Sequence, residues 1–358
     1  MQFERFDLLA RVVEGHARSQ YDLSSSDMPA TRLSECGGLS DRSLAESHVG
    51  GGEELRTELA QLYGGRPDDY IVTAGASEAN FAVYAALLSP GDRVLVERPT
   101  YQPLEAIPRG LGAAVGSLVR LEEEGFRMTA DRALAAVPED LRILVLTNLN
   151  NPTGAALAAS EVRALAGLAA ERESFLFIDE TFRELAPDGV TQSLGGLNDR
   201  AIVTSTLSKF YGAGGLRIGW IRAAAPVRSR IQSVLDYLSA TPSAVSEPIA
   251  IALLRNRPKI LARNRGLMEQ GQKVFREWAT AEPDLTWHEP VAHLTFPGIG
   301  GNTARLADLL LRDYGTFIAP GESFGLPGHF RLNVGIGAEK LLEGLTRVSK
   351  ARAALRGC

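Results

Sequence analysis

Lysine is nearly missing from the first 258 residues of this 358-residue chain, where Lys209 is the only one although arginine is used freely. Cysteine is also scarce, because Cys36 and Cys358 are the only two and form no C-x-x-C pair. This spacing argues against a disulfide framework and against a zinc site, so we expect no bound metal. A reducing, cytoplasmic setting fits such a chain.

Long apolar runs and blocks of like charge are absent too. No run of about 18 apolar residues occurs, and the charged start of the chain lacks the apolar core of a signal peptide, so no membrane partner is expected. The net charge of −5 is spread along the chain, which gives no reason to expect nucleic acid as a partner. With 45% hydrophobic residues, the sequence suits a globular protein of two domains.

The lone lysine suggests a chemical role because the composition otherwise favours arginine as the generic cation. A guanidinium stays protonated, whereas an ε-amine that loses its proton attacks a carbonyl carbon to form a Schiff base. In the first 258 residues only Lys209 offers that chemistry. The alternative interpretation is a solvated surface charge, which is the commoner fate of a lysine.

The surroundings of Lys209 decide how it is interpreted. The apolar residues 201–203 before it predict a buried strand, and the glycines at 212–215 after it predict a tight turn. Arg217 follows eight residues after the lysine and offers a bidentate anion-binding group. An amine for a carbonyl together with an arginine for a phosphate describes pyridoxal phosphate.

Strands and helices alternate from Tyr70 onward, which predicts a largely parallel sheet covered by helices. Residues 70–73 and 93–97 read as strands, with a helix to about residue 88 between them. The turn at 75–77 therefore falls at a helix N-terminus, where free backbone N–H groups favour an anion. Ser77 is equally explained as a simple N-cap.

Further polar residues follow three other predicted strands. Tyr101 comes after the strand ending at Glu97, where it could stack on a planar ligand, although an ordinary packed aromatic is the commoner explanation. Residues 148–154 follow the next strand, and Asp179 ends another. These strand ends share one edge of the sheet with the lysine turn, and α/β sheets bind ligands at such an edge.

The chain divides into three parts by its pattern. We expect an N-terminal segment at 1–45 that packs with the small domain, a large cofactor-binding domain at 46–243, and a C-terminal small α+β domain at 244–358. The composition changes near residues 239–243, after which long helical patterns run through about 246–280.

Taken in order, these residues resemble the class I/II aminotransferases of the fold-type I, aspartate aminotransferase-like pyridoxal-phosphate enzymes, over nearly the whole chain. The resemblance implies their fold, an α/β large domain with a mostly parallel helix-flanked sheet plus a smaller α+β domain. The matching pieces are Gly75-Ala76-Ser77-Glu78-Ala79, Pro99-Thr100-Tyr101, Asn151-Pro152-Thr153-Gly154, Asp179-Glu180-Thr181-Phe182, Thr206-Leu207-Ser208-Lys209 with Arg217, and Arg331-Leu332-Asn333.

The resemblance also implies roles in catalysis. Lys209 would hold pyridoxal 5′-phosphate as an internal aldimine and then move the proton between Cα and C4′. Asp179 would pair with the pyridine nitrogen and keep it protonated, so that the ring acts as an electron sink.

The remaining implied roles concern binding. The phosphate would be held by Ala76 and Ser77 with Glu78 close by, and by Thr206 and Arg217.

Tyr101 would stack on the cofactor ring, and Asn151 would contact its 3′-oxygen and the substrate. Arg331 would take the substrate α-carboxylate in a two-bond fork, with the segment near Ser26 closing over it. For Arg331 a surface salt bridge is the alternative.

Two positions depart from the family's usual residues. Phe182 stands where a tyrosine usually donates to the 3′-oxygen, which opens the question of the reaction type. His48 lies near the place of a tyrosine that usually reaches the partner subunit's phosphate, and it is a candidate replacement.

The leading hypothesis is therefore an aminotransferase that moves an amino group between an L-amino acid and a 2-oxo acid. The resemblance also implies a homodimer with shared active sites. The alternatives are another pyridoxal-phosphate enzyme on this fold, such as a lyase, decarboxylase, cyclase or oxidase, and a non-enzymatic regulator that senses the cofactor. The substrate stays open, because Arg32, Arg109 and Arg183 are candidates for a second carboxylate site by position only.

Overall fold

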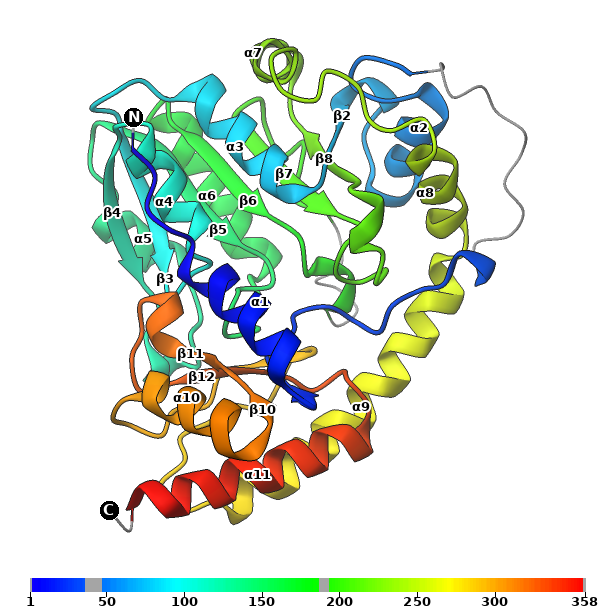
Figure 1. Ribbon diagram of the computed structural model, residues 1–358. Helices are drawn as coiled ribbons and strands as arrows, with labels where there is room; N and C mark the ends of the chain where they lie inside the picture. The colour runs from blue at the N-terminus through cyan, green and yellow to red at the C-terminus, as the bar shows by residue number, and fades with distance from the viewer. Residues whose placement is uncertain (1, 36–46, 187–192, 357–358) are drawn as a thin grey trace.

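A seven-stranded sheet organises the part of the chain that the computed structural model describes, residues 2–35, 47–186 and 193–356 (Figure 1). The strand order is β2-β8-β7-β6-β5-β3-β4, and every neighbouring pair is parallel except the two that β8 makes. The strands are β2 (Tyr70–Thr73), β3 (Arg93–Arg98), β4 (Ala114–Val119), β5 (Leu141–Thr147), β6 (Phe175–Asp179), β7 (Ala201–Thr206) and β8 (Gly219–Arg222).

Helices cover both faces of this sheet because alternate residues of its buried strands point to opposite sides. In β5, Ile143 and Val145 belong to the core shared with α3, α4 and α7, whereas Leu144 and Leu146 belong to the core shared with α5 and α6. The helices are α3 (Ala76–Leu87), α4 (Pro103–Gly110), α5 (Ala130–Ala136), α6 (Ala159–Glu171) and α7 (Ala225–Leu235). The predicted fold class, a mostly parallel sheet flanked by helices, is confirmed.

A third core lies beside the sheet. It joins α2 (Glu53–Tyr63) and α8 (Ser246–Arg255) to the turn that follows β7. Phe210 and Tyr211 of that turn are fully buried in it. Apolar packing of Phe210 and Tyr211 against α2 and α8 therefore holds the backbone next to Lys209 in place.

The C-terminal part adds a small sheet and three long helices (Figure 1). Its elements are α9 (Arg257–Ala281), α10 (Thr303–Tyr314), α11 (Ala338–Arg356) and the antiparallel sheet of β11 (Ala319–Pro320), β12 (Phe330–Asn333) and β9 (Leu294–Thr295). From the N-terminal segment, β1 (Tyr21–Asp22) pairs with β10 (Thr316–Phe317), and Leu23 is buried in the core of this part. The domain boundaries at 45 and 243 stay predictions.

Two elements differ from the sequence-based prediction. The first helix, α1, spans Asp7–Arg18 instead of beginning at residue 3, and the Asp7 N–H donates to Gln102 Oε1 at 3.1 Å, a cap from another element. The edge strand β4 has no alternating apolar pattern, since Leu118 is its one buried residue, and it went unpredicted.

Some expectations concern features that the structure describes only in part. Cys36 and Cys358 lie outside the described residues. Within the described ranges, no helix has both the length and the apolar character needed to cross a bilayer.

Candidate active site

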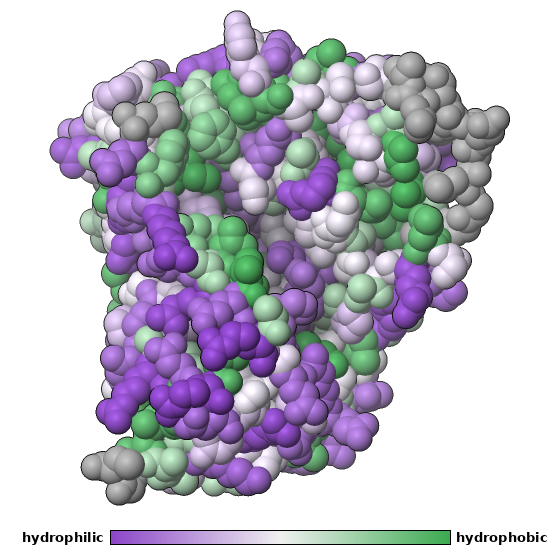
Figure 2. Space-filling model, in the orientation of Figure 1, coloured by the Kyte–Doolittle hydropathy of each residue, from purple (hydrophilic) through white to green (hydrophobic). Residues whose placement is uncertain are grey.

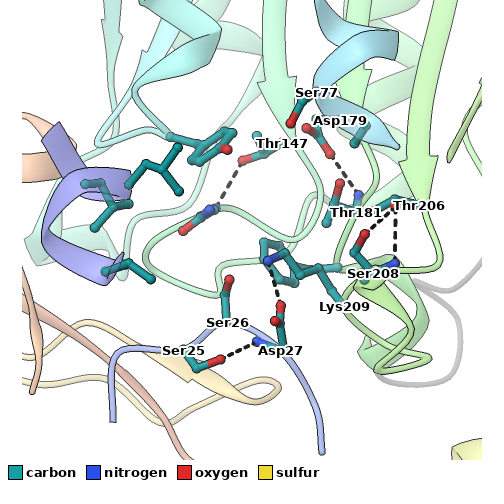
Figure 3. Close-up of a pocket in the computed structure, with 18 of the residues that line it drawn as sticks. Ser25, Ser26, Asp27, Ser77, Thr147, Asp179, Thr181, Thr206, Ser208 and Lys209 are labelled. Atoms are coloured by element: carbon teal, nitrogen blue, oxygen red, sulfur yellow. Dashed lines mark hydrogen bonds and ion pairs between the residues drawn. The ribbon is translucent and has the colours of Figure 1, made fainter. Parts of the chain in front are cut away.

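A cavity of about 340 Å³ lies at the carboxyl edge of the large sheet, between the strand ends, α1 and the N-terminal segment (Figure 3). Figure 2 shows this face hollowed near its centre, with apolar side chains along one border of the hollow. The lining residues come from segments that are far apart in the sequence: Phe6, Leu8, Leu9, Val12, Ser24–Asp27, Ala76, Ser77, Asn80, Tyr101, Thr147, Asn151, Asp179, Thr181, Phe182, Thr206, Ser208, Lys209, Gly214, Arg217 and Arg331.

Lys209 lies in the turn after β7, and its ammonium group reaches the cavity. Its Nζ is 2.6 Å from Asp27 Oδ1, and its side chain is 29% exposed. The turn is fixed from behind, because Asn264 donates to the Phe210 carbonyl at 2.7 Å. Lys209 therefore presents a reachable amine from a rigid turn.

Asp179 ends β6 and presents a fixed carboxylate on the opposite side of the cavity from Asp27 (Figure 3). Its Oδ2 accepts from Asn80 Nδ2 at 2.9 Å, and its Oδ1 accepts from the Thr181 N–H at 2.9 Å. Asn80 is in turn held by the Thr204 hydroxyl at 2.7 Å. A buried carboxylate held by neutral donors alone is suited to pair with a cationic N–H of a ligand.

The first turn of α3 and Arg217 form an anion cradle. Gly75 has φ +89°, and a Cβ there would lie 2.5 Å from Arg217 Nη2, so glycine is required for this close approach. Arg217 donates to the carbonyls of Ala74 at 2.7 Å and Gly214 at 3.2 Å, and it pairs with no carboxylate of the described chain. The helix N-terminus and the guanidinium together favour a phosphate.

Hydroxyl groups complete the cradle. Thr206 Oγ1 donates to the Ile218 carbonyl at 2.9 Å and lies 2.9 Å from Ser208 Oγ. Ser208 was not predicted to take part; it lies in the turn after β7, and its N–H donates to Thr206 Oγ1 at 3.2 Å, a local turn contact of the kind that Ser and Thr favour. Thr181 Oγ1 was missed as well, and it is buried against the cavity with no hydrogen-bond partner.

Arg331, on β12, is a buried guanidinium that pairs with no carboxylate among the residues that the structure describes. It is 3% exposed, and it donates to Asn151 Oδ1 at 2.8 Å and to the Ser24 carbonyl at 2.7 Å, while its Nε is buried without a partner. Its carbon Cζ lies 5.0 Å from the centre of the Phe324 ring. Burial lowers the pKa of Arg331 to about 10, so it is still charged at neutral pH. The surface salt bridge considered for this residue is excluded within the described chain.

Two aromatic residues border the cavity. Burial raises the pKa of Tyr101 to about 12, so it stays a neutral phenol, and its hydroxyl is hydrogen-bonded to Ser77. Phe182 is 4% exposed and packs on His293 with ring centres 5.1 Å apart. Burial lowers the pKa of His293 to about 3, so the neutral ring donates from Nε2 to the Ser26 carbonyl at 3.1 Å.

Five other candidates do not line the cavity. Glu78 points away, because its Oε2 accepts from the Ala74 N–H at 2.6 Å and from Ser239 at 3.0 Å. His48 is exposed. Of the candidate arginines, Arg183 is buried against Glu180 and Glu184, Arg109 pairs with Glu105, and Arg32 lies elsewhere; none reaches the cavity.

A buried ion pair supports the loop that carries Asn151. Glu97 and Arg120 are completely buried, and Arg120 donates to Glu97 Oε2 through Nε at 2.8 Å and Nη2 at 2.6 Å. The other oxygen of Glu97 accepts from the Thr147 N–H at 2.8 Å and from Asn150 Nδ2 at 2.7 Å. One carboxylate therefore fixes the start of this loop at the cavity.

Replacing Glu97 by glutamine is expected to lower the free energy of unfolding by about 3–5 kcal/mol, because the Arg120 charge stays buried without compensation. Urea unfolding followed by circular dichroism measures it. The matched control is Glu343→Gln, which removes an exposed ion pair with Arg347 and is expected to cost less than about 0.5 kcal/mol. Equally small losses of unfolding free energy in Glu97→Gln and Glu343→Gln would contradict the proposed support of the loop by Glu97.

The cavity fits pyridoxal phosphate. It joins a reachable amine, a carboxylate that has no cationic partner among the described residues, an anion cradle in which Arg217 packs against Gly75, and a neutral tyrosine. On a mostly parallel sheet with a small C-terminal part, these features define the fold-type I pyridoxal-phosphate enzymes.

Comparison with known proteins gives the family. The model of the family described as aminotransferase class I and II matches residues 38–348. An arginine–pyruvate transaminase of Pseudomonas aeruginosa is 30% identical over 325 residues, which cover 86% of this chain and 82% of the relative.

Two solved structures share the fold over almost their full length. A pyridoxal-phosphate-dependent aminotransferase of Streptococcus suis superposes with a TM-score of 0.91 at 26% identity, covering 99% of each chain. The pyridoxal-phosphate-dependent cyclase OrfR gives a TM-score of 0.87 at 26% identity, covering 96% of this chain and 97% of its own. The chain belongs to the class I and II aminotransferase family, and its cofactor is pyridoxal phosphate.

Proposed function

We propose that this cavity holds the cofactor and an amino acid together, and that the protein moves an amino group from an L-amino acid to a 2-oxo acid. The observation that carries the proposal is Arg331, a buried guanidinium that lines the same cavity as Lys209 and has no carboxylate partner in the described ranges. Burying an unpaired charge is costly, so the arrangement is understandable if a ligand supplies the missing carboxylate.

Each proposed role follows from a position in the cavity. Arg217, Thr206, Ser208 and the N–H groups of Ala76 and Ser77 would hold the phosphate. When bound, the cofactor supplies a protonated ring that withdraws electrons from the substrate's Cα.

Asp179 would hold the proton on the ring nitrogen, and Tyr101 would cover the ring. Asn151, already bonded to Arg331, would orient both the guanidinium and the 3′-oxygen. Lys209 would hold the cofactor through its ε-amine, and once the substrate's amino group has displaced it, the freed ε-amine would take the proton from the substrate's Cα.

Transfer of labelled nitrogen tests the proposal. The purified protein with pyridoxal phosphate is incubated with single nitrogen-labelled amino acids and either pyruvate or 2-oxoglutarate. We expect the label in the newly formed alanine or glutamate, together with the 2-oxo acid of the donor. If no donor passes its nitrogen to any acceptor, transamination is wrong.

A second reaction on the same scaffold is favoured by Phe182, which cannot donate to the 3′-oxygen, and by the likeness to a cyclase structure. The same experiment distinguishes the two, because a cyclase or lyase consumes the amino acid without forming a labelled second amino acid.

We also infer a homodimer in the cytoplasm. Support comes from exposed apolar side chains on the connection between α7 and α8, where Tyr237 is 91% exposed, its sequence neighbour Leu238 is exposed, and so is Val245. Such a patch is typical of an interface between subunits. Light scattering coupled to size-exclusion chromatography measures the assembly.

A further inference from the structure

One charged group of the cavity has no part in the proposed chemistry. The charged residues that line the cavity in the described chain are Asp27, Asp179, Lys209, Arg217 and Arg331. The proposed function already gives the other residues a partner: Asp179, Lys209 and Arg217 bind the cofactor, and Arg331 binds the substrate's α-carboxylate. Asp27 remains as a carboxylate without an assigned partner among the reacting groups.

The backbone on both sides of Asp27 is fixed. The Asp27 carbonyl accepts from Asn333 Nδ2 at 2.8 Å, and its N–H donates to Ser25 Oγ at 3.2 Å. The next N–H, of Met28, donates to the Lys209 carbonyl at 3.1 Å. The carboxylate is therefore held at the cavity by contacts to the lysine turn and to β12, and Figure 3 shows it directed at Lys209.

The present partner of Asp27 is not a lasting one. Lys209 Nζ lies 2.6 Å from it, but in the holoenzyme that an amino donor first meets, the lysine holds the cofactor and presents no free ammonium group. The side chain of Asp27 is 50% exposed, so it is accessible to a ligand in the cavity. A carboxylate in this position favours a cationic group of the ligand, since charge-assisted hydrogen bonds are the stronger ones.

The wall formed by Phe6 and α1 is apolar. Phe6, Leu8, Leu9 and Val12 line the cavity and offer no charge to a substrate. Long basic side chains have an apolar methylene stem and a charged end, which matches an apolar wall combined with one carboxylate. Among the described residues of this chain a second acidic group would find no spare arginine, because both arginines that line the cavity are accounted for.

We propose that Asp27 recognises the cationic side chain of the amino donor, so that basic amino acids are the preferred donors. The proposal rests on the transaminase function proposed above.

The first test compares two donors of nearly equal shape, arginine and its neutral analogue citrulline. The holoenzyme is expected to use arginine with the higher kcat/KM, and Asp27→Asn is expected to lower that value about tenfold while citrulline is unchanged. The control Glu14→Gln removes one negative charge from the outer side of α1, where Glu14 pairs with Arg18, and should leave both values unchanged. An equal loss of kcat/KM with arginine and with citrulline would mean that Asp27 acts on proton transfer by Lys209 and not on the donor's side chain. That result would overturn the proposal.

A binding measurement separates this inference from the reaction itself. The acids δ-guanidinovalerate and δ-ureidovalerate lack the α-amino group, so they bind without reacting. Calorimetry with the holoenzyme should show tighter binding of the guanidino acid, and Asp27→Asn should remove the difference. Equal affinities in the unchanged protein would overturn the role of Asp27 even if amino transfer is observed. If no donor transfers its nitrogen, the proposed transaminase function is wrong. Tighter binding of the guanidino acid than of the ureido acid would still support recognition by Asp27.

Discussion

The variant Lys209→Arg is expected to lose covalent attachment of pyridoxal phosphate and to lower kcat by about 10³-fold or more. A guanidinium stays protonated and cannot attack the cofactor's aldehyde. The substitution retains a positive charge opposite Asp27, 2.6 Å away in the present structure, so the fold should be unaffected. Borohydride reduction followed by intact-mass analysis measures the covalently held cofactor directly.

The matched control is Lys259→Arg, the next lysine along the chain, which is exposed on α9. It should retain both the covalent mass shift and the activity. A mass shift that persists in Lys209→Arg would overturn the assignment of the lysine. A lowered melting temperature in that variant would indicate that its loss of activity comes from the fold.

The structure brings into one cavity several of the residues that the sequence placed at strand ends. Asp179 follows an apolar strand and Lys209 follows another, and parallel strands bring such ends to one edge whatever the side chains do next. Asn151 and Arg331 are 180 positions apart and meet at 2.8 Å, a contact for which the sequence contains no local signal.

The direction of individual side chains after a strand end could not be predicted. Glu78 lies in the first turn of α3 beside Ser77, yet it bonds back to the Ala74 N–H instead of facing the cavity. Nothing in the sequence indicated that Asp27 lines the cavity. Its position depends on contacts to Lys209, in the turn after β7, and to Asn333 on β12. Local patterns specify elements, whereas such contacts depend on how distant elements meet.

Substitution of Arg331 is expected to impair activity without lowering stability. Arg331→Gln should raise the KM for the amino donor by about 10²-fold, with a smaller effect on kcat, because a carboxylate held equally before and during the reaction contributes mainly to binding. The free energy of unfolding should be unchanged or higher, since the substitution removes a buried cation without a carboxylate partner in the described chain.

Steady-state kinetics and urea unfolding of the same samples measure the two effects, with Arg312→Gln as the control, an exposed arginine paired with Asp313. Arg331→Lys should restore little, because a single ammonium group cannot form the two-bond fork of a guanidinium. A parallel loss of stability in Arg331→Gln would show that the bonds to Asn151 and Ser24 serve the fold. Lost binding at full stability is the result expected of a group whose partner is the substrate, since only the ligand then supplies the missing carboxylate.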